Sequence, residues 1–229
     1  VTTVQKILAH DGEFIYRDHN VPWNVTARNV DVTMAKGDSY GGEVSFTDGL
    51  VEIAAFEPMK VEMRADYELD GADVNVSQMD LTMDGFYSDI TGKIDVANWP
   101  EQTYQIVDSD IDLPAMKDIF FAGDPFAVAG DARFVGAWHL FDGGRELTGR
   151  FQSDDWTLNG LAFSDTNGSL VWTRDKFEVL DYMSGFYGGD VRLTYVMAPL
   201  GTDEQGMATL DTTVTDVDVS ALSEAVALA

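Results

Sequence analysis

The chain has 229 residues, with 14 basic and 40 acidic side chains and a formal charge of −26. Such an acidic surface repels nucleic-acid phosphates and anionic lipid headgroups, so we expect no nucleic-acid partner and no flat electrostatic docking on a membrane. The apolar fraction of 45% is typical of a folded protein, and the absence of cysteine excludes disulfides, thiol nucleophiles and thiolate metal sites.

Alternation of apolar and polar residues predicts strands over much of the chain. Between Lys60 and Asp70 every second residue is apolar, which is typical of a strand with one face in water. The run over residues 74–83 changes phase once, and this slip predicts a β-bulge near Ser77 and Gln78. Further alternating runs cover residues 132–140, 147–151, 191–197 and 210–214.

Glycine after aspartate or asparagine marks the expected turns. The pairs are Asp48-Gly49, Asp70-Gly71, Asp142-Gly143, Asn159-Gly160 and Asn167-Gly168. Their spacing suits antiparallel hairpins and is too short for the crossovers of a parallel sheet. We therefore expect an all-β protein with about 14–17 strands stacked side by side.

Two stretches have the apolar spacing of short helices, residues 114–121 and 220–228. The segment that leads into the first, residues 110–116, recurs as residues 216–222, and Tyr40-Gly41-Gly42 recurs as Tyr187-Gly188-Gly189. These matches predict two β-repeat units in one continuous sheet, residues 1–123 and 124–229, each ending in a short helix.

The apolar faces of the predicted strands need a cover, because a sheet with one apolar face buries it against helices, a second sheet, its own curvature or a ligand. Two short helices cannot cover so many strands. An elongated, curved, open sheet with a groove is therefore expected, and a β-sandwich is the alternative. The candidate groove residues are Val61, Met63, Ala65, Tyr67, Leu69, Val74, Val76, Met79, Leu81, Met83, Phe134, Trp138, Val191, Leu193 and Tyr195.

Catalytic motifs are weak. Residues 37–41 read Gly-Asp-Ser-Tyr-Gly, which matches the nucleophile elbow of hydrolases, but a strand pattern follows Ser39 where an elbow requires a helix. The histidines, His10, His19 and His139, are scattered and do not have the spacing of a zinc site. We therefore expect no catalytic residue and no enzymatic activity.

One acidic motif, Asp108-x-Asp110-x-Asp112, is similar to the start of a calcium loop. Leu113 occupies the position where that loop requires glycine, and Ile119 occupies the position of its last glutamate ligand. The sequence therefore predicts neither a metal site nor a cofactor.

The order of these features resembles the repeated β-rich body of the AsmA-like proteins, especially the translocation-and-assembly-module (TamB-like) branch. The features are an Asp-Gly-aromatic opening with Tyr16-Arg17, then Tyr40-Gly41-Gly42, alternating strands, and an Asp-x-Asp segment that leads into a short helix. The resemblance implies a large periplasmic envelope protein anchored in the inner membrane by an N-terminal helix. Its body is a long, curved sheet shaped like a taco shell, with an apolar concave face.

Two hypotheses about function follow. In the first, the chain is a non-enzymatic piece of an envelope-spanning bridge whose groove carries phospholipid acyl chains between membranes or supports outer-membrane assembly. The resemblance implies that flanking segments contact the membranes and an outer-membrane assembly partner, and we expect the chain to be a piece of a longer protein. In the second, it is a structural or adhesive extracytoplasmic β-repeat module, with sheets packed on each other and acidic residues that bind calcium.

Overall fold

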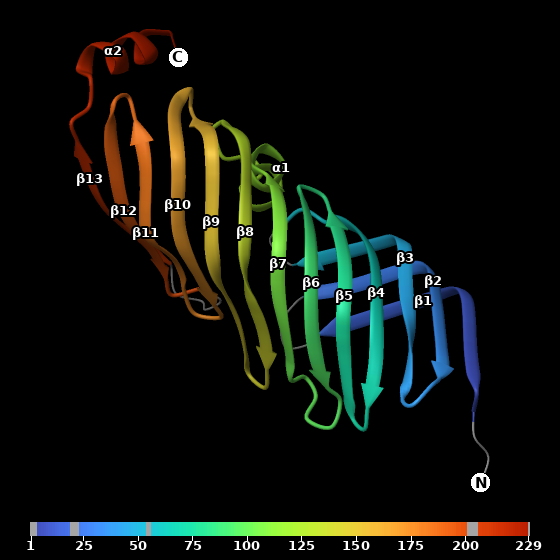
Figure 1. The fold of residues 1–229 in the computed structure, drawn as a ribbon. Helices are drawn as coiled ribbons and strands as arrows, with labels where there is room; N and C mark the ends of the chain where they lie inside the picture. Colours follow the sequence, from blue (N-terminus) through green and yellow to red (C-terminus); the bar gives the residue numbers. More distant parts are fainter. Residues whose placement is uncertain (1–3, 19–22, 54–55, 201–205, 229) are drawn as a thin grey trace.

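The computed structural model describes residues 4–18, 23–53, 56–200 and 206–228 (Figure 1). The strands are β1 (Lys6–Asp18), β2 (Trp23–Lys36), β3 (Tyr40–Ile53), β4 (Met59–Asp70), β5 (Asp73–Met83), β6 (Phe86–Asp95), β7 (Gln102–Asp112), β8 (Val128–Phe141), β9 (Gly144–Leu158), β10 (Leu161–Thr173), β11 (Phe177–Phe186), β12 (Gly189–Ala198) and β13 (Met207–Thr215). Two helices, α1 (Leu113–Phe120) and α2 (Val219–Leu228), follow β7 and β13.

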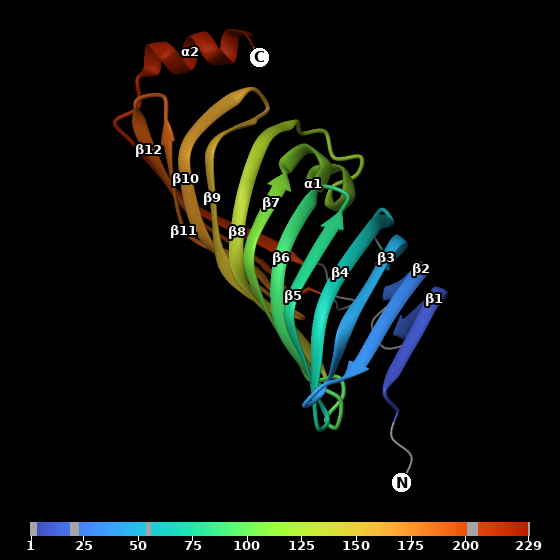
Figure 2. The ribbon, with the colours of Figure 1, turned by 45° about the vertical axis from the view of Figure 1, so that its right-hand side comes forward.

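The 13 strands form one antiparallel sheet in which each strand pairs with its neighbours in sequence. β1 and β13 are the two edges, so the sheet is open. Figure 2 shows that the strands bend along their length, which makes the sheet a curved single layer. These observations confirm the expected all-β, open, antiparallel architecture. A β-sandwich is excluded for the part of the chain described, because that part has no second sheet for the first to pack on.

The surface area reflects this single layer. A compact monomer of this mass exposes about 10,300 Å². The chain exposes 13982 Å², about a third more than that. Few side chains are therefore fully buried, and those that are belong mostly to one face of the sheet.

β-Bulges bend the strands. Ser77 is an extra residue in β5, because Asp66 pairs with Gln78 while Tyr67 pairs with Val76, and this confirms the bulge that the phase slip predicts. Other bulges contain an aspartate or asparagine with a positive φ; these residues are Asp11 (53°), Asn29 (54°), Asp165 (47°) and Asp181 (51°). Aspartate and asparagine adopt this left-handed conformation more readily than other side chains that carry a Cβ.

Two of the expected turns are wrong. Asp48-Gly49 lies inside β3 and Asn167-Gly168 lies inside β10, each beside a shift in register. Aromatic rings contact both glycines, since an added Cβ would come within 2.6 Å of Phe46 at Gly49 and within 2.5 Å of Phe151 at Gly168. Strands that continue through these pairs are longer and fewer, so the sheet has 13 strands where about 14–17 were expected.

Both helices begin within one residue of the predicted position, and their first turns share a geometry. The backbone N–H of Asp112 donates to Gly85 O at 2.8 Å, and that of Asp218 donates to Tyr187 O at 2.8 Å. Each aspartate also accepts a hydrogen bond from a backbone N–H of the first helical turn. The matching Asp-x-Asp segments therefore have the same role. Each caps a helix and hydrogen-bonds its start to an earlier hairpin turn, the β5–β6 turn for α1 and the β11–β12 turn for α2.

Substitution of a bulge aspartate tests the origin of the bend. Asp181→Val is expected to lower the free energy of unfolding by about 1–2 kcal/mol, because the valine Cβ is crowded at a positive φ. Asp154→Val is the control, since Asp154 is also exposed and in a strand but has an ordinary φ. Chemical denaturation measures both. Equal stability of the two variants would show that the left-handed residue does not determine the bend.

Candidate functional site

The two faces of the sheet differ in burial, as β4 illustrates. Val61 and Ala65 are each 4% exposed, and Met63 between them is half-buried. Glu62 and Arg64, which alternate with them, are exposed. We call the face of Val61, Met63 and Ala65 the inner face and the opposite one the outer face. Residues that pair directly across neighbouring strands share a face, so the register assigns the rest of the sheet.

Two ladders of paired residues cross the inner face from β1 to β13 without a charged side chain. Ladder A consists of Ala9, Val32, Val44, Ala65, Met79, Ile90, Ile106, Gly136, Gly149, Leu170, Val179, Tyr195 and Leu210. Ladder B consists of Ile7, Met34, Gly42, Tyr67, Val76, Gly92, Tyr104, Trp138, Leu147, Trp172, Phe177, Met197 and Ala208. The inner face is therefore uncharged along these two ladders from one edge of the sheet to the other, and most of their side chains are apolar.

The register places every candidate groove residue on the inner face. The buried candidates are Val61, Ala65, Val76, Phe134 and Val191. The half-buried candidates are Met63, Tyr67, Leu69, Val74, Met79, Leu81, Met83, Trp138, Leu193 and Tyr195. The buried group is covered by neighbouring side chains, so a ligand on this face would touch mainly the half-buried group. Contact with lipid stays a prediction for both groups.

Aromatic rings cover glycines on the inner face. Tyr67 pairs with Gly42, and its hydroxyl donates to Thr33 O on the next strand at 3.1 Å, so the ring crosses β3 at the glycine. Burial raises the pKa of Tyr67. Phe134 lies against two glycines of ladder A, since an added Cβ at Gly149 would come within 2.4 Å of its ring. Rings that cover strand glycines in this way restore buried apolar area and give the face a broad aromatic surface.

The sequence pattern missed an aromatic stack on β9, β10 and β11. The rings of Trp156 and Phe163 lie 4.6 Å apart, and those of Phe163 and Phe186 lie 5.0 Å apart. A search for strict two-residue alternation does not detect these rings, because a bulge shifts the phase of the alternation, as the bulge at Asp165 does in β10. The sequence does contain one signal of such a bulge, which is an aspartate followed by small polar residues inside an otherwise alternating run.

Small hydroxyl side chains are buried near shifts in the strand register. Ser88 and Ser109 are 2% and 4% exposed and hydrogen-bond to each other. Thr166 and Ser184 are 4% and 3% exposed, and their hydroxyl oxygens lie 2.8 Å apart. Because these hydroxyls have partners, their burial carries little penalty.

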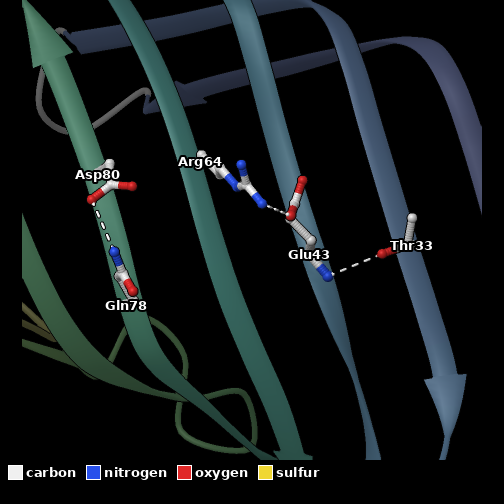
Figure 3. Close-up of polar contacts among 5 residues, drawn as sticks. All are labelled: Thr33, Glu43, Arg64, Gln78 and Asp80. Atoms are coloured by element: carbon white, nitrogen blue, oxygen red, sulfur yellow. Dashed lines mark hydrogen bonds and ion pairs between the residues drawn. The ribbon is translucent and has the colours of Figure 1, made fainter.

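The outer face is polar and rich in carboxylates. Figure 3 shows Arg64 donating to Glu43 at 2.5 Å, with the backbone N–H of Glu43 donating to Thr33 Oγ1 at 3.1 Å. Gln78 donates to Asp80 at 3.3 Å in the same region. Exposed ion pairs of this kind contribute little to stability, so their main effect is to keep the face hydrated.

Carboxylates also face one another across strands of the outer face. Asp80 pairs with Asp89, and Asp89 pairs with Asp108. The hydroxyl of Tyr87 donates to Asp89 at 2.7 Å, and this bond, with the neighbouring negative charges, raises the pKa of Tyr87 to about 12. Tyr87 is therefore a neutral donor to these acids at physiological pH.

The other residues considered from the sequence do not come together. Ser39 lies in the loop before β3 and donates to Glu68, while His139 lies 2.6 Å from Glu101. Asp110 pairs with Arg133 at 3.3 Å and Asp112 caps α1, so they do not converge on one cation. His19 is outside the described residues.

Among the described residues, no cluster of three or more histidine, cysteine, aspartate or glutamate side chains could hold a metal ion. Within the same residues, neither helix is long and apolar enough to cross a membrane. Comparisons with family models, curated proteins and solved structures gave no match. The resemblance to AsmA-like proteins therefore stays a prediction.

Proposed function

We propose that this protein is a non-enzymatic lipid-holding segment whose inner face takes up phospholipid acyl chains. The observation that supports the proposal is the pair of apolar ladders, A and B, on a sheet that has no second layer among the described residues. An uncovered apolar face is costly in water, at about 25 cal/mol for each Å². A hydrocarbon ligand would remove that cost without requiring hydrogen-bond partners.

The dimensions suit acyl chains. Strands in a sheet are about 4.8 Å apart, so a ladder through all the strands is about 58 Å long. An acyl chain spans about half of the roughly 30 Å hydrocarbon core of a bilayer. The inner face could therefore hold several chains one after another, which is the geometry that a conduit requires.

The acidic outer face has a separate role in this proposal. A charge of −26 keeps an open sheet soluble and opposes edge-to-edge association between copies. It does not attract anionic headgroups, so hydrocarbon on the inner face supplies the main attraction. The site of action that we propose is the periplasm, in an AsmA/TamB-like bridge whose flanking segments contact the membranes and an outer-membrane assembly partner.

The alternative of a calcium-stabilised adhesive module has less support. It requires sheets packed on each other and a cluster of acidic ligands. In the ranges that the structure covers, the strands form a single layer and no group of acids could hold a metal ion.

Tryptophan fluorescence tests the proposed function. Trp138 and Trp172 lie in ladder B, whereas Trp99 is 56% exposed between β6 and β7. One variant keeps Trp138 and Trp172 and another keeps only Trp99, with phenylalanine replacing the other tryptophans. Phospholipid with brominated acyl chains, which quench on contact, should quench the first variant strongly and the second weakly. Equal quenching of the two variants, or none in either, would contradict the proposal.

A further inference from the structure

Two arginines meet at one rim of the inner face. Arg145 lies on this face in β9, two residues before Leu147 of ladder B, and its guanidinium is 5.4 Å from the centre of the Trp172 ring. Arg174 follows β10 and donates to Gly143 O at 3.4 Å. Both line a pocket of about 380 Å³ between the β8–β9 and β10–β11 turns. The pocket therefore places two cationic side chains beside the part of ladder B that crosses β9 and β10, where Arg145 contacts Trp172.

Neither arginine of this pair forms an ion pair with a carboxylate of the described residues. Arg145 Nε is buried and has no hydrogen-bond partner among them. Glu146 and Asp175 line the pocket as well, but neither pairs with the arginines. Burial and the nearby charge of Arg174 lower the pKa of Arg145.

Arginines without a carboxylate partner are unexpected here. Acidic residues outnumber basic ones by 40 to 14, so a carboxylate partner is easily supplied. Buried polar groups and charges normally have partners, because an unpaired one loses its hydration without compensation. Two guanidinium groups that line one pocket and form no ion pair therefore indicate a site where an anion binds.

We infer that Arg145 and Arg174 bind the anionic, phosphate-bearing headgroup of a lipid whose chains lie along ladder B. The planar fork of a guanidinium donates two parallel hydrogen bonds to a phosphate, which a lysine cannot do. At the rim the headgroup stays in contact with water while the chains extend over Trp172 and Leu147. The inference rests on the proposed function, because it assigns a headgroup to the lipid whose chains occupy the inner face.

The test compares two amphiphiles with the same short acyl chains, a phosphatidic acid and a neutral diacylglycerol, and inorganic phosphate alone. Binding is followed by the change in tryptophan emission, to which Trp138 and Trp172 on the inner face contribute. The variants are Arg145→Gln and Arg174→Gln, with Arg150→Gln as the matched control. Arg150 is an exposed arginine on the outer face of β9. Arg174 is also exposed, so its substitution should leave folding intact even if Arg145→Gln does not.

The wild-type protein should bind phosphatidic acid about tenfold or more tightly than diacylglycerol. Each rim variant should reduce that preference, and Arg150→Gln should keep it. Similar affinities for both amphiphiles, or a preference that survives both rim variants, would contradict the headgroup site. The proposed binding of acyl chains to the inner face would not be affected. Inorganic phosphate binding as tightly as phosphatidic acid would identify a free-phosphate site instead. No binding of either amphiphile would contradict the proposed function itself.

Discussion

Phe134→Ala is expected to lower the free energy of unfolding by about 3–5 kcal/mol, the cost of removing a large side chain from a protein core. Phe134 is 7% exposed, pairs with Phe151, and lies against the backbone of Gly136 and Gly149. Its removal would expose these glycines, which have no side chains to fill the space. Chemical denaturation with an intrinsic fluorescence readout measures the loss.

Val135→Ala is the matched control. Val135 is the next residue in β8, but it is 45% exposed on the outer face. We expect it to cost less than about 1 kcal/mol, because most of its surface is already in water. Similar losses at the two positions would show that the inner face is not the core of this sheet. The pair therefore tests the assignment of faces independently of any ligand.

The sequence was sufficient to predict strands wherever the alternation is regular. β4 has eleven alternating residues with no interruption from Lys60 to Asp70, and its predicted inner face is correct. The bulge at Ser77 was also predictable, because one extra residue in a strand shifts the apolar alternation by a single position. Both helices were found since their apolar spacing follows an Asp-x-Asp segment that caps them.

Other features depend on contacts that a sequence pattern does not contain. Asn167-Gly168 has the composition of a hairpin turn, but its glycine is covered by the ring of Phe151 and the strand continues. The contact between the Arg145 guanidinium and the Trp172 ring depends on the register of β9 against β10, which alternation alone does not specify. The aromatic stack that includes Phe163 is hidden for a related reason, because a bulge changes the phase within the strand.

Photo-crosslinking along β4 gives the largest expected difference between the two faces. A crosslinking residue at Met63, Ala65 or Tyr67 projects from the inner face, and one at Glu62, Arg64 or Asp66 projects from the outer face. Neighbouring positions lie in the same strand and carry the same crosslinking side chain, so each outer position is a control for its inner neighbour. Because Ala65 is 4% exposed, Met63 and Tyr67 are the more informative inner positions.

Mass spectrometry of these crosslinked proteins after illumination in cells tests directly whether the inner face holds acyl chains. We expect phospholipid adducts at Met63 and Tyr67 and none at Arg64 or Asp66, because the apolar ladders lie on the inner face alone. Equal adduct formation on both faces, or no adduct on either face, would contradict the claim that the inner face holds acyl chains.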